Sequence, residues 1–347
     1  MVVTVTSKLC KDFSTKETID KSENGEWSQD LWAKLAEIEL FSIGVSEELG
    51  GFGGDYKDAC SVIYLAGKYA VPLPLSETII GKWVLSELGQ TTKDEPLTFS
   101  FEEGNEVQIT KSNNSVVVTG TLSEVPWGRH AKSIVTLGTM NGKSYVVQLP
   151  VDKAVVHKIN NIAGEPRDTV EFEAVVLEGL SLYTVDRDAF KEKMMNLATL
   201  SRIVMMAGAM ERILELSVRY SSEREQFGRP LHRFQAIQHH LSELAGETVI
   251  AISSMNNAIE AYEEGQFSQE LAHARIRINE AAGKVATSAH QLHGAIGVTY
   301  EHSLHQYTRR LWAWREEYGN EAVWVDKLVA QLMENADESL WEIVTSY

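Results

Sequence analysis

The hydrophobic positions between about residues 28 and 88 follow a helical period. Four apolar residues of DLWAKLAEIELFSIG recur at three- and four-residue steps: Leu31, Leu35, Ile38 and Phe41. This spacing predicts one amphipathic helix, which the glycine-rich ELGGFGG ends because glycines adopt backbone angles that no helix continues. Asp55 is then placed to cap a second helix, DYKDACSVIYLAGKYA, which stops before Pro72 and Pro74.

From about residue 97 to residue 185 the period falls to two. Short runs rich in β-branched and aromatic residues alternate with Asn, Gly and Asp: LTFSF, EVQIT, SVVVTG, SIVTL, SYVVQL, AVVHKI and TVEFEAVVL. Strands this short and this closely spaced predict a compact antiparallel barrel or sandwich.

Beyond residue 187 the helical period returns in segments of roughly 188–225, 233–263, 268–293 and 300–342. Long amphipathic helices with short connections are typical of a bundle. Helices, strands and helices are therefore segregated along the chain, which favours an α+β protein over an alternating βα sheet. We expect an N-terminal helical domain (1–92), a middle β domain (93–186) and a C-terminal helical bundle (187–347).

The chain of 347 residues carries 32 Lys and Arg against 49 Asp and Glu, a formal net charge of −17. A surface this acidic argues against binding to nucleic acid or to an anionic membrane, because both need a cationic face. The hydrophobic fraction of 44% is ample for folded cores.

The two cysteines, Cys10 and Cys60, provide neither a disulfide framework nor metal-ligand spacing. The N-terminal residues lack the pattern of a secretory signal, and no uninterrupted apolar run is long enough to span a membrane. We expect a cytoplasmic protein.

The stretch SSEREQFGRPLHRFQAIQHHLSELAGE is the most distinctive candidate for a binding site. A turn between two helices exposes unpaired backbone amides, and this turn also gathers Arg224, Arg229, His232 and Arg233. The combination suits a phosphate or pyrophosphate. An ordinary helical hairpin with solvated arginines is the alternative.

A second segment, QLHGAIGVTY, closes another helix and combines Gln291 and His293 with Gly294 and Gly297. The glycines permit close backbone approach to a ligand, although helices also commonly end at glycine. The chain has no GxSxG motif, no HExxH motif and no cysteine cluster, so neither a serine hydrolase nor a catalytic zinc is indicated.

Taken together, these segments resemble the acyl-CoA dehydrogenase family over nearly the whole chain. The segment LWAKLAEIELFSIGVSEELGGFGG is similar to the family's helix and glycine loop, and GEPRDTVEFEAVVL to the strand that leaves its β domain. REQFGRPLHRFQAIQHHLSELAGE and QLHGAIG, followed by Tyr307 and Arg309, resemble its two C-terminal signatures. The implied fold is an N-terminal helical domain, a middle antiparallel β-barrel and a C-terminal four-helix bundle.

The resemblance implies FAD-dependent α,β-desaturation of an acyl-CoA thioester in lipid or fatty acid catabolism, with electrons passed to an electron-transferring flavoprotein. A carboxylate removes the acidified α proton while a hydride leaves the β carbon for the flavin. In this family FAD lies between subunits, so we expect an oligomer, as a dimer of dimers.

The cofactor contacts that the resemblance implies fall in three parts of the chain. Arg224 matches the arginine that meets the FAD pyrophosphate, and Gln226, Phe227 and Phe234 match its neighbours. Gln291, Leu292 and Gly294 match the segment that approaches the adenosine half from the partner subunit. Trp127 is a candidate for one wall of the flavin ring, and a buried structural tryptophan is the alternative.

The chain departs from the family at the catalytic base. Many members carry the glutamate of a Tyr-Glu-Gly motif after the arginine of the last helix, but Tyr318 occupies that position here. Glu317 is the candidate base, although one residue is about 100° around a helix, so it serves only if the backbone is irregular there. Other members place their glutamate near Ala198, where this chain has no acid.

The middle domain departs as well. The family's Thr-Glu-Pro segment reads FSFEEG here, and its Trp-x-Thr segment reads VPWGRHA, with Pro126 in place of the hydroxyl. Proline has no N–H to donate to the flavin.

Short, FadE-like chains whose flavin-facing loop lacks the family's motif resemble the smaller subunit of heteromeric acyl-CoA dehydrogenases. The alternatives are therefore a self-sufficient homo-oligomeric enzyme and a non-catalytic or partner-requiring subunit that assembles with a paralogue. A flavin-dependent monooxygenase of the same fold is a third reading, which needs no α-proton base.

Overall fold

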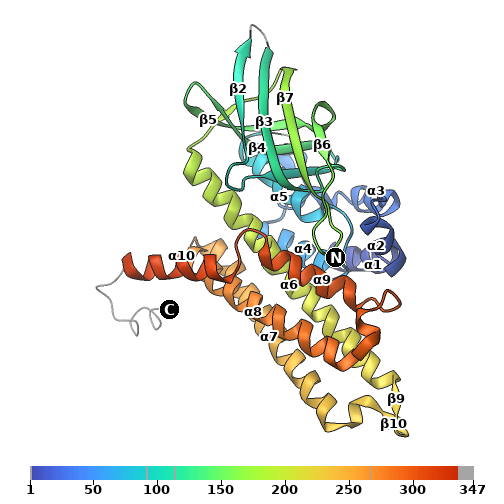
Figure 1. The fold of residues 1–347 in the computed structure, drawn as a ribbon. Helices are drawn as coiled ribbons and strands as arrows, with labels where there is room; N and C mark the ends of the chain where they lie inside the picture. Colours follow the sequence, from blue (N-terminus) through green and yellow to red (C-terminus); the bar gives the residue numbers. More distant parts are fainter. Residues whose placement is uncertain (1, 91–92, 113–114, 266, 335–347) are drawn as a thin grey trace.

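The computed structural model describes residues 2–90, 93–112, 115–265 and 267–334. Figure 1 shows a sheet at one end, N-terminal helices beside it and a bundle of long helices extending away. The order of elements confirms an α+β chain with helical N- and C-terminal parts. None of the helices built from the described residues combines the length and apolar character needed to cross a bilayer.

The N-terminal part is made of helices and short 3₁₀ turns. They are α1 (Val2–Phe13), α2 (Lys16–Glu23), α3 (Gln29–Glu37), η1 (Leu40–Ser42), η2 (Glu47–Leu49), α4 (Tyr56–Lys68) and α5 (Leu75–Glu87). Asp55 caps α4 as expected: its carboxylate accepts from the Asp58 amide at 2.9 Å, and Asp58 in turn accepts from the Asp55 amide. The prediction that α3 continues to Phe41 is wrong, because Glu39 adopts a left-handed φ of 55° that ends the helical path.

The middle strands lie close to their predicted positions. They are β1 (Leu97–Ser100), β2 (Glu106–Ser112), β3 (Ser115–Pro126), β4 (Ser133–Met140), β5 (Lys143–Pro150), β6 (Val155–His157), β7 (Arg167–Glu178) and β8 (Tyr183–Thr184), with η3 (Val151–Lys153) before β6. They form one sheet in the order β6-β7-β3-β2-β4-β5-β8, with β1 also paired to β4.

Two features of this sheet differ from the prediction. Both β1 and β2 pair with β4 in parallel, so a wholly antiparallel sheet was wrong. Closure into a barrel is not confirmed, because among the described residues no pairing joins the end strands β6 and β8. Strand periodicity predicts where strands lie, but pairing direction depends on long-range contacts that the period does not contain.

The C-terminal part consists of α6 (Arg187–Glu223), α7 (Gln235–Glu264), α8 (Phe267–His293), α9 (Leu304–Glu316) and α10 (Glu321–Glu334). Between them lie the β9 (Glu225–Gln226) and β10 (Arg229–Pro230) hairpin, η4 (Leu231–Arg233) and η5 (Gly294–Val298). Helices α6 to α9 pack together, and α10 packs against α8. The single helix predicted over 300–342 is interrupted at residues 317–320, and its last positions, 335–342, lie outside the described residues.

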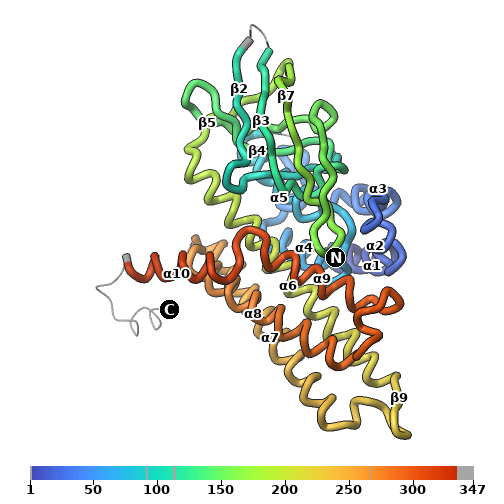
Figure 2. Tube along the Cα trace, viewed as in Figure 1, coloured from blue at the N-terminus to red at the C-terminus, as the bar shows by residue number. Residues whose placement is uncertain are grey.

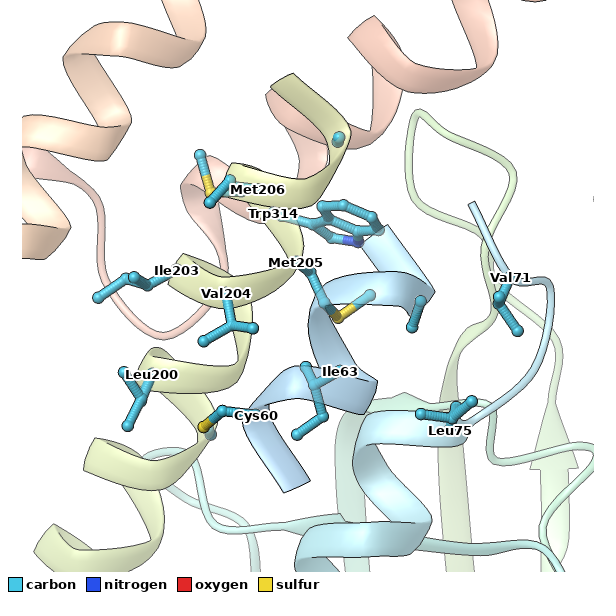
Figure 3. Packing of buried hydrophobic residues seen from close by; sticks show 14 of the residues in the cluster. Cys60, Ile63, Val71, Leu75, Leu200, Ile203, Val204, Met205, Met206 and Trp314 are labelled. Atoms are coloured by element: carbon cyan, nitrogen blue, oxygen red, sulfur yellow. The ribbon is translucent and has the colours of Figure 1, made fainter. Parts of the chain in front are cut away.

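One hydrophobic core joins the N-terminal helices to the bundle. Figure 3 shows Cys60 and Ile63 of α4 against Leu200 and Val204 of α6. The helices approach closely at Gly208, where an added Cβ would lie 2.2 Å from the Tyr64 carbonyl oxygen. A second core lies within the sheet. Met194, Met205 and Met206 are buried in the core that joins the helices, while Met195 is half-buried.

Candidate active site

A cavity of about 640 Å³ opens where the sheet meets α6 and the end of α9. Its walls include Glu102 from the loop after β1, Pro126 from β3, Arg167 from β7 and Glu317 from the turn after α9. The two segments that stand in the places of the family's flavin-facing loops and the candidate base therefore meet in one cavity, although they are far apart in the sequence. Ala198 lies in an adjoining small pocket with Tyr318 and Glu102.

Glu317 reaches this cavity because the backbone leaves the helix at this residue. Its own φ and ψ are −72° and 138°, and Tyr318 and Gly319 follow with φ of 57° and 98°. The guanidinium of buried Arg275 holds the turn by donating to the carbonyl oxygens of Trp314 at 2.8 Å and Glu317 at 2.5 Å. The irregular backbone that the sequence required for Glu317 to enter the site is therefore present.

The Glu317 carboxylate is held by two buried arginines. Its Oε1 accepts from Arg167 Nε at 2.8 Å and from Asn161 Nδ2 at 3.3 Å. Its Oε2 accepts from Arg202 Nε at 2.6 Å. Burial alone raises the pKa of this carboxyl, but the two guanidinium charges outweigh it and lower the pKa below the usual value. A carboxylate held in this way is a weak base, because charged donors already occupy its lone pairs.

The same arginines belong to a wider buried network that the sequence pattern did not reveal. Arg202 also pairs with Glu77 of α5 at 2.7 Å, and Arg167 pairs with Glu165 at 3.3 Å. Glu77 and Arg202 lie 125 positions apart, so no local spacing connects them. The network ties α5, α6, β7 and the turn after α9 into one rigid wall of the cavity.

Two further carboxyls, those of Glu102 and Glu124, line the same cavity. Burial, together with the negative charges of Glu124 and Glu317 and against the opposing charge of Arg167, raises the pKa of Glu102 to about 7. In the sequence, FSFEEG is only a departure from the family pattern. The fold brings Glu124 of β3 close to Glu102 in the loop after β1.

Pro126 lines the cavity, but the adjacent Trp127 is buried and is not among the lining residues. The Trp127 amide donates to the Pro166 carbonyl oxygen at 3.0 Å, and its ring centroid lies 6.1 Å from that of His130. Its contact with a flavin stays a prediction. Among the described residues, no group of three or more His, Cys, Asp or Glu side chains is arranged to hold a metal ion.

The predicted pyrophosphate-binding residues lie at the far end of the bundle, at the tip marked β9 in Figure 2. Phe227 and Gly228 form the two-residue turn of the β9–β10 hairpin, with φ of 52° and 78°. The Phe227 side chain is 93% exposed. Arg224 and Gln226 are also exposed, and the Arg224 guanidinium makes no ion pair or hydrogen bond within the described part of the chain. We call residues 224–234 the arm.

Phe234 lies at the base of the arm, half-buried, with its ring centroid 6.2 Å from that of Phe227. The guanidinium of Arg229 stacks on the Phe234 ring at 4.1 Å. Arg229 is therefore engaged in the arm's own packing, which leaves Arg224 as the more available cation.

The second predicted segment lies close to the root of the arm. The rings of Tyr220 on α6 and His293 on α8 stack with centroids 4.5 Å apart. Gln291 is exposed, and open space surrounds Gly294, where φ is 63°. Leu292 is instead buried, so only its backbone is available to a ligand.

The arm and the cavity of one chain lie near opposite ends of α6. Met195 lines the cavity and Arg224 follows the last turn of the helix. At 1.5 Å per residue, the 29 residues between them span about 40 Å. That distance exceeds the length of one dinucleotide, so a single chain cannot hold the same FAD molecule with both.

Two family models match the chain: "Acyl-CoA dehydrogenase, N-terminal domain" over residues 3–94 and "Acyl-CoA dehydrogenase, C-terminal domain" over residues 189–344. Together they cover more than two thirds of the sequence. The chain belongs to the acyl-CoA dehydrogenase family. The family resemblance of the sequence motifs is thereby confirmed.

Individual relatives agree with this membership. The acyl-CoA dehydrogenase IpdE2 of Mycolicibacterium smegmatis is 28% identical over 308 residues, covering 87% of this chain and 88% of that protein. The fold is similar to that of the ChsE4–ChsE5 complex from Mycobacterium tuberculosis, with a TM-score of 0.83, 21% identity and 96% coverage of both chains. Butyryl-CoA dehydrogenase from Megasphaera elsdenii also gives a TM-score of 0.83, at 19% identity with 96% and 98% coverage.

Members of the acyl-CoA dehydrogenase family generally bind FAD. The arm and the cavity of this chain differ in how well their residues fit that cofactor. At the arm, an unpaired guanidinium, an exposed aromatic ring and the open Gly294 fit an anionic dinucleotide. In the cavity, Pro126 has no N–H and the nearby Arg167 is already paired with Glu317. The arm therefore fits the phosphate half of FAD well. The cavity is poor in hydrogen-bond donors for the flavin ring.

Proposed function

We propose that this chain is an acyl-CoA dehydrogenase polypeptide that desaturates the α,β bond of an acyl-CoA thioester in lipid catabolism, in the cytoplasm. FAD supplies the acceptor for the hydride, and an electron-transferring flavoprotein takes the electrons onward. One observation carries the proposal: the three segments that occupy the places of the family's flavin- and substrate-facing regions line a single cavity, while the arm projects about 40 Å away.

The separation of arm and cavity supports a cofactor site shared between chains. In this arrangement Arg224, Gln226, Phe227 and Phe234 of one chain hold the pyrophosphate side of FAD. Gln291, Gly294 and the backbone of Leu292 approach the adenosine half from the partner. The chain is then an obligate oligomer, and the boundaries 1–92, 93–186 and 187–347 describe its three domains.

The cavity itself favours a second form of the same function. Glu317 is neutralised by Arg167 and Arg202, and Pro126 cannot donate to the flavin. These features support a subunit that needs a paralogous acyl-CoA dehydrogenase chain, which would supply the more complete flavin site. The arm of this chain would then complete the partner's cofactor site.

Flavin absorbance of the purified chain, alone and co-expressed with a paralogous subunit, tests both forms. A yellow homo-oligomer whose flavin is bleached by an acyl-CoA supports self-sufficiency. A colourless chain that yields a yellow complex only with its partner supports the heteromer. Absence of flavin and of acyl-CoA-dependent bleaching in both preparations contradicts the proposed function.

The role of the arm is tested by Arg224→Gln, with Arg219→Gln as the matched control because Arg219 is an exposed arginine of the same helix. Loss of a charge-assisted contact worth about 1.5–3 kcal/mol weakens FAD binding roughly 10- to 100-fold in Arg224→Gln. Arg219→Gln should keep its flavin. Equal flavin content in both variants would remove Arg224 from the site.

A further inference from the structure

The loop that carries Glu102 is fastened to the strand that carries Glu124. Buried Asn105 donates from Nδ2 to Ser100 Oγ at 2.7 Å and to the Ser123 carbonyl oxygen at 2.8 Å. Its Oδ1 accepts from the Ser123 amide at 2.9 Å. A single amide side chain thus fixes the end of β1 against β3, immediately beside Glu124.

Glu124 projects from an irregular point of its strand. The register between β3 and β7 shifts between Leu122 and Val125, and Glu124 has a left-handed φ of 53°. Bulges of this kind redirect side chains and are frequent next to active sites. A non-glycine residue at positive φ costs free energy, so the surrounding contacts must hold it. Its side chain lines the same cavity as that of Glu102, and its negative charge raises the pKa of Glu102.

The two candidate carboxylates of the cavity therefore differ in the availability of their oxygen atoms. Glu317 accepts from Arg167, Arg202 and Asn161, whereas within the described residues no arginine or lysine forms an ion pair with Glu102. Removal of a proton from carbon needs an oxygen lone pair directed at the substrate, and Glu102 has one to offer.

The charged groups around Glu102 come from three elements. Glu124 faces it from β3, Arg167 from β7, and Glu317 and Tyr318 from the turn after α9. Because Arg167 is paired with Glu317, the dominant neighbour of Glu102 is a like charge. Half-burial and a like-charge neighbour hold the pKa of Glu102 at about 7, close to the value that suits a general base at neutral pH.

We infer that Glu102, paired with Glu124 and positioned by Asn105, is the proton acceptor of this cavity, and that Glu317 is a structural residue. The inference rests on the proposed function, because the substrate it names is an acyl thioester. In the step, the Cα–H bond breaks and its proton forms an O–H bond on the Glu102 carboxylate. The electron pair stays with the substrate as an enolate, delocalised onto the thioester carbonyl.

The experiment measures deuterium incorporation at Cα of butyryl-CoA, octanoyl-CoA and palmitoyl-CoA in D₂O, using the chain in its native assembly. Glu102→Gln should slow exchange by at least about 100-fold, the usual minimum contribution of a positioned base. Glu103→Gln is the matched control, since the adjacent Glu103 carboxylate is 89% exposed and pairs with Lys191. It should exchange within about two-fold of the wild type, and Glu317→Gln should keep exchange in its folded fraction.

Two further readouts separate a base from a structural carboxyl. The wild-type exchange rate should rise with pH around a midpoint of about 7, and Glu124→Gln should move that midpoint to lower pH by removing a neighbouring negative charge. Infrared titration of the carboxyl band lost in Glu102→Gln should give the same midpoint without any ligand. Circular dichroism verifies that each variant is folded.

Wild-type exchange that persists in Glu102→Gln overturns the inference and leaves the proposed function standing. A Glu102 carboxyl that titrates near the ordinary glutamate value of about 4.3 overturns it as well. Absence of both exchange and flavin bleaching in the wild type overturns the proposed function itself. The two failures are therefore distinguishable.

Discussion

Replacing Glu317 with glutamine should destabilise the protein strongly, because the carboxylate is the shared partner of two buried arginines. Arg202 is fully buried and Arg167 nearly so, and Glu317 contacts both at 2.6 Å. Glutamine keeps the size of the side chain but removes its charge. Removal of one partner from a buried ion pair typically costs about 3–5 kcal/mol, because the remaining charge is left uncompensated.

The surrounding network sets the magnitude within this range. Arg202 keeps Glu77 at 2.7 Å and Arg167 keeps Glu165 at 3.3 Å, so neither guanidinium becomes completely unpaired. The Glu317 side chain also reaches the cavity, where water screens part of the charge. We therefore expect the lower end, a loss of about 3 kcal/mol in the free energy of unfolding.

The pH dependence of this loss has a definite sign. The pKa of Glu317 is lower in the folded state than its ordinary value. Its contribution to stability is therefore complete above the unfolded value of about 4.3 and decreases as the pH falls through the folded-state pKa. The difference between wild type and Glu317→Gln should be constant near neutral pH and should shrink below about pH 4.

Urea denaturation followed by circular dichroism measures the effect, with Glu316→Gln as the control. Glu316 is the exposed neighbour, and within the described residues its carboxylate accepts one hydrogen bond, from Asn320 Nδ2 at 3.3 Å. The control should lie within about 0.5 kcal/mol of the wild type. A loss below about 1 kcal/mol in Glu317→Gln, or a loss equal to that of the control, would refute the structural role inferred from the contacts of Glu317 with Arg167 and Arg202.

Three other perturbations test the fold. Gly208→Ala should cost about 1–3 kcal/mol in urea denaturation, because its Cβ would lie 2.2 Å from the Tyr64 carbonyl oxygen; an unchanged midpoint would contradict this close helix contact. Asp55→Ala should cost about 1 kcal/mol through loss of the helix cap, and Asp55→Asn, which keeps an acceptor, should restore most of it. Burial raises the pKa of both Cys10 and Cys60, so iodoacetamide should modify them only after unfolding; rapid labelling of the native protein would show that they are accessible.

Local sequence patterns determined the elements of this protein and the family to which it belongs. The period-two runs placed the strands, and the helical period together with Asp55 placed α4 almost to the residue. The arm was also predictable, because the Gly228–Pro230 region is a local turn signal and the turn's arginines lie close together in the sequence. These features depend on neighbouring residues, which a sequence displays directly.

Only the tertiary structure decided the chemistry of the cavity. Glu317 was identified from its place in a motif, but its two arginine partners come from β7 and α6. Because both guanidinium groups pair with its carboxylate, this candidate base acts as their counter-ion. The pairing of Glu102 with Glu124 depends on a strand bulge and on Asn105. The pKa of a carboxyl is set by burial and by charges a few ångströms away, and folding alone brings those charges together.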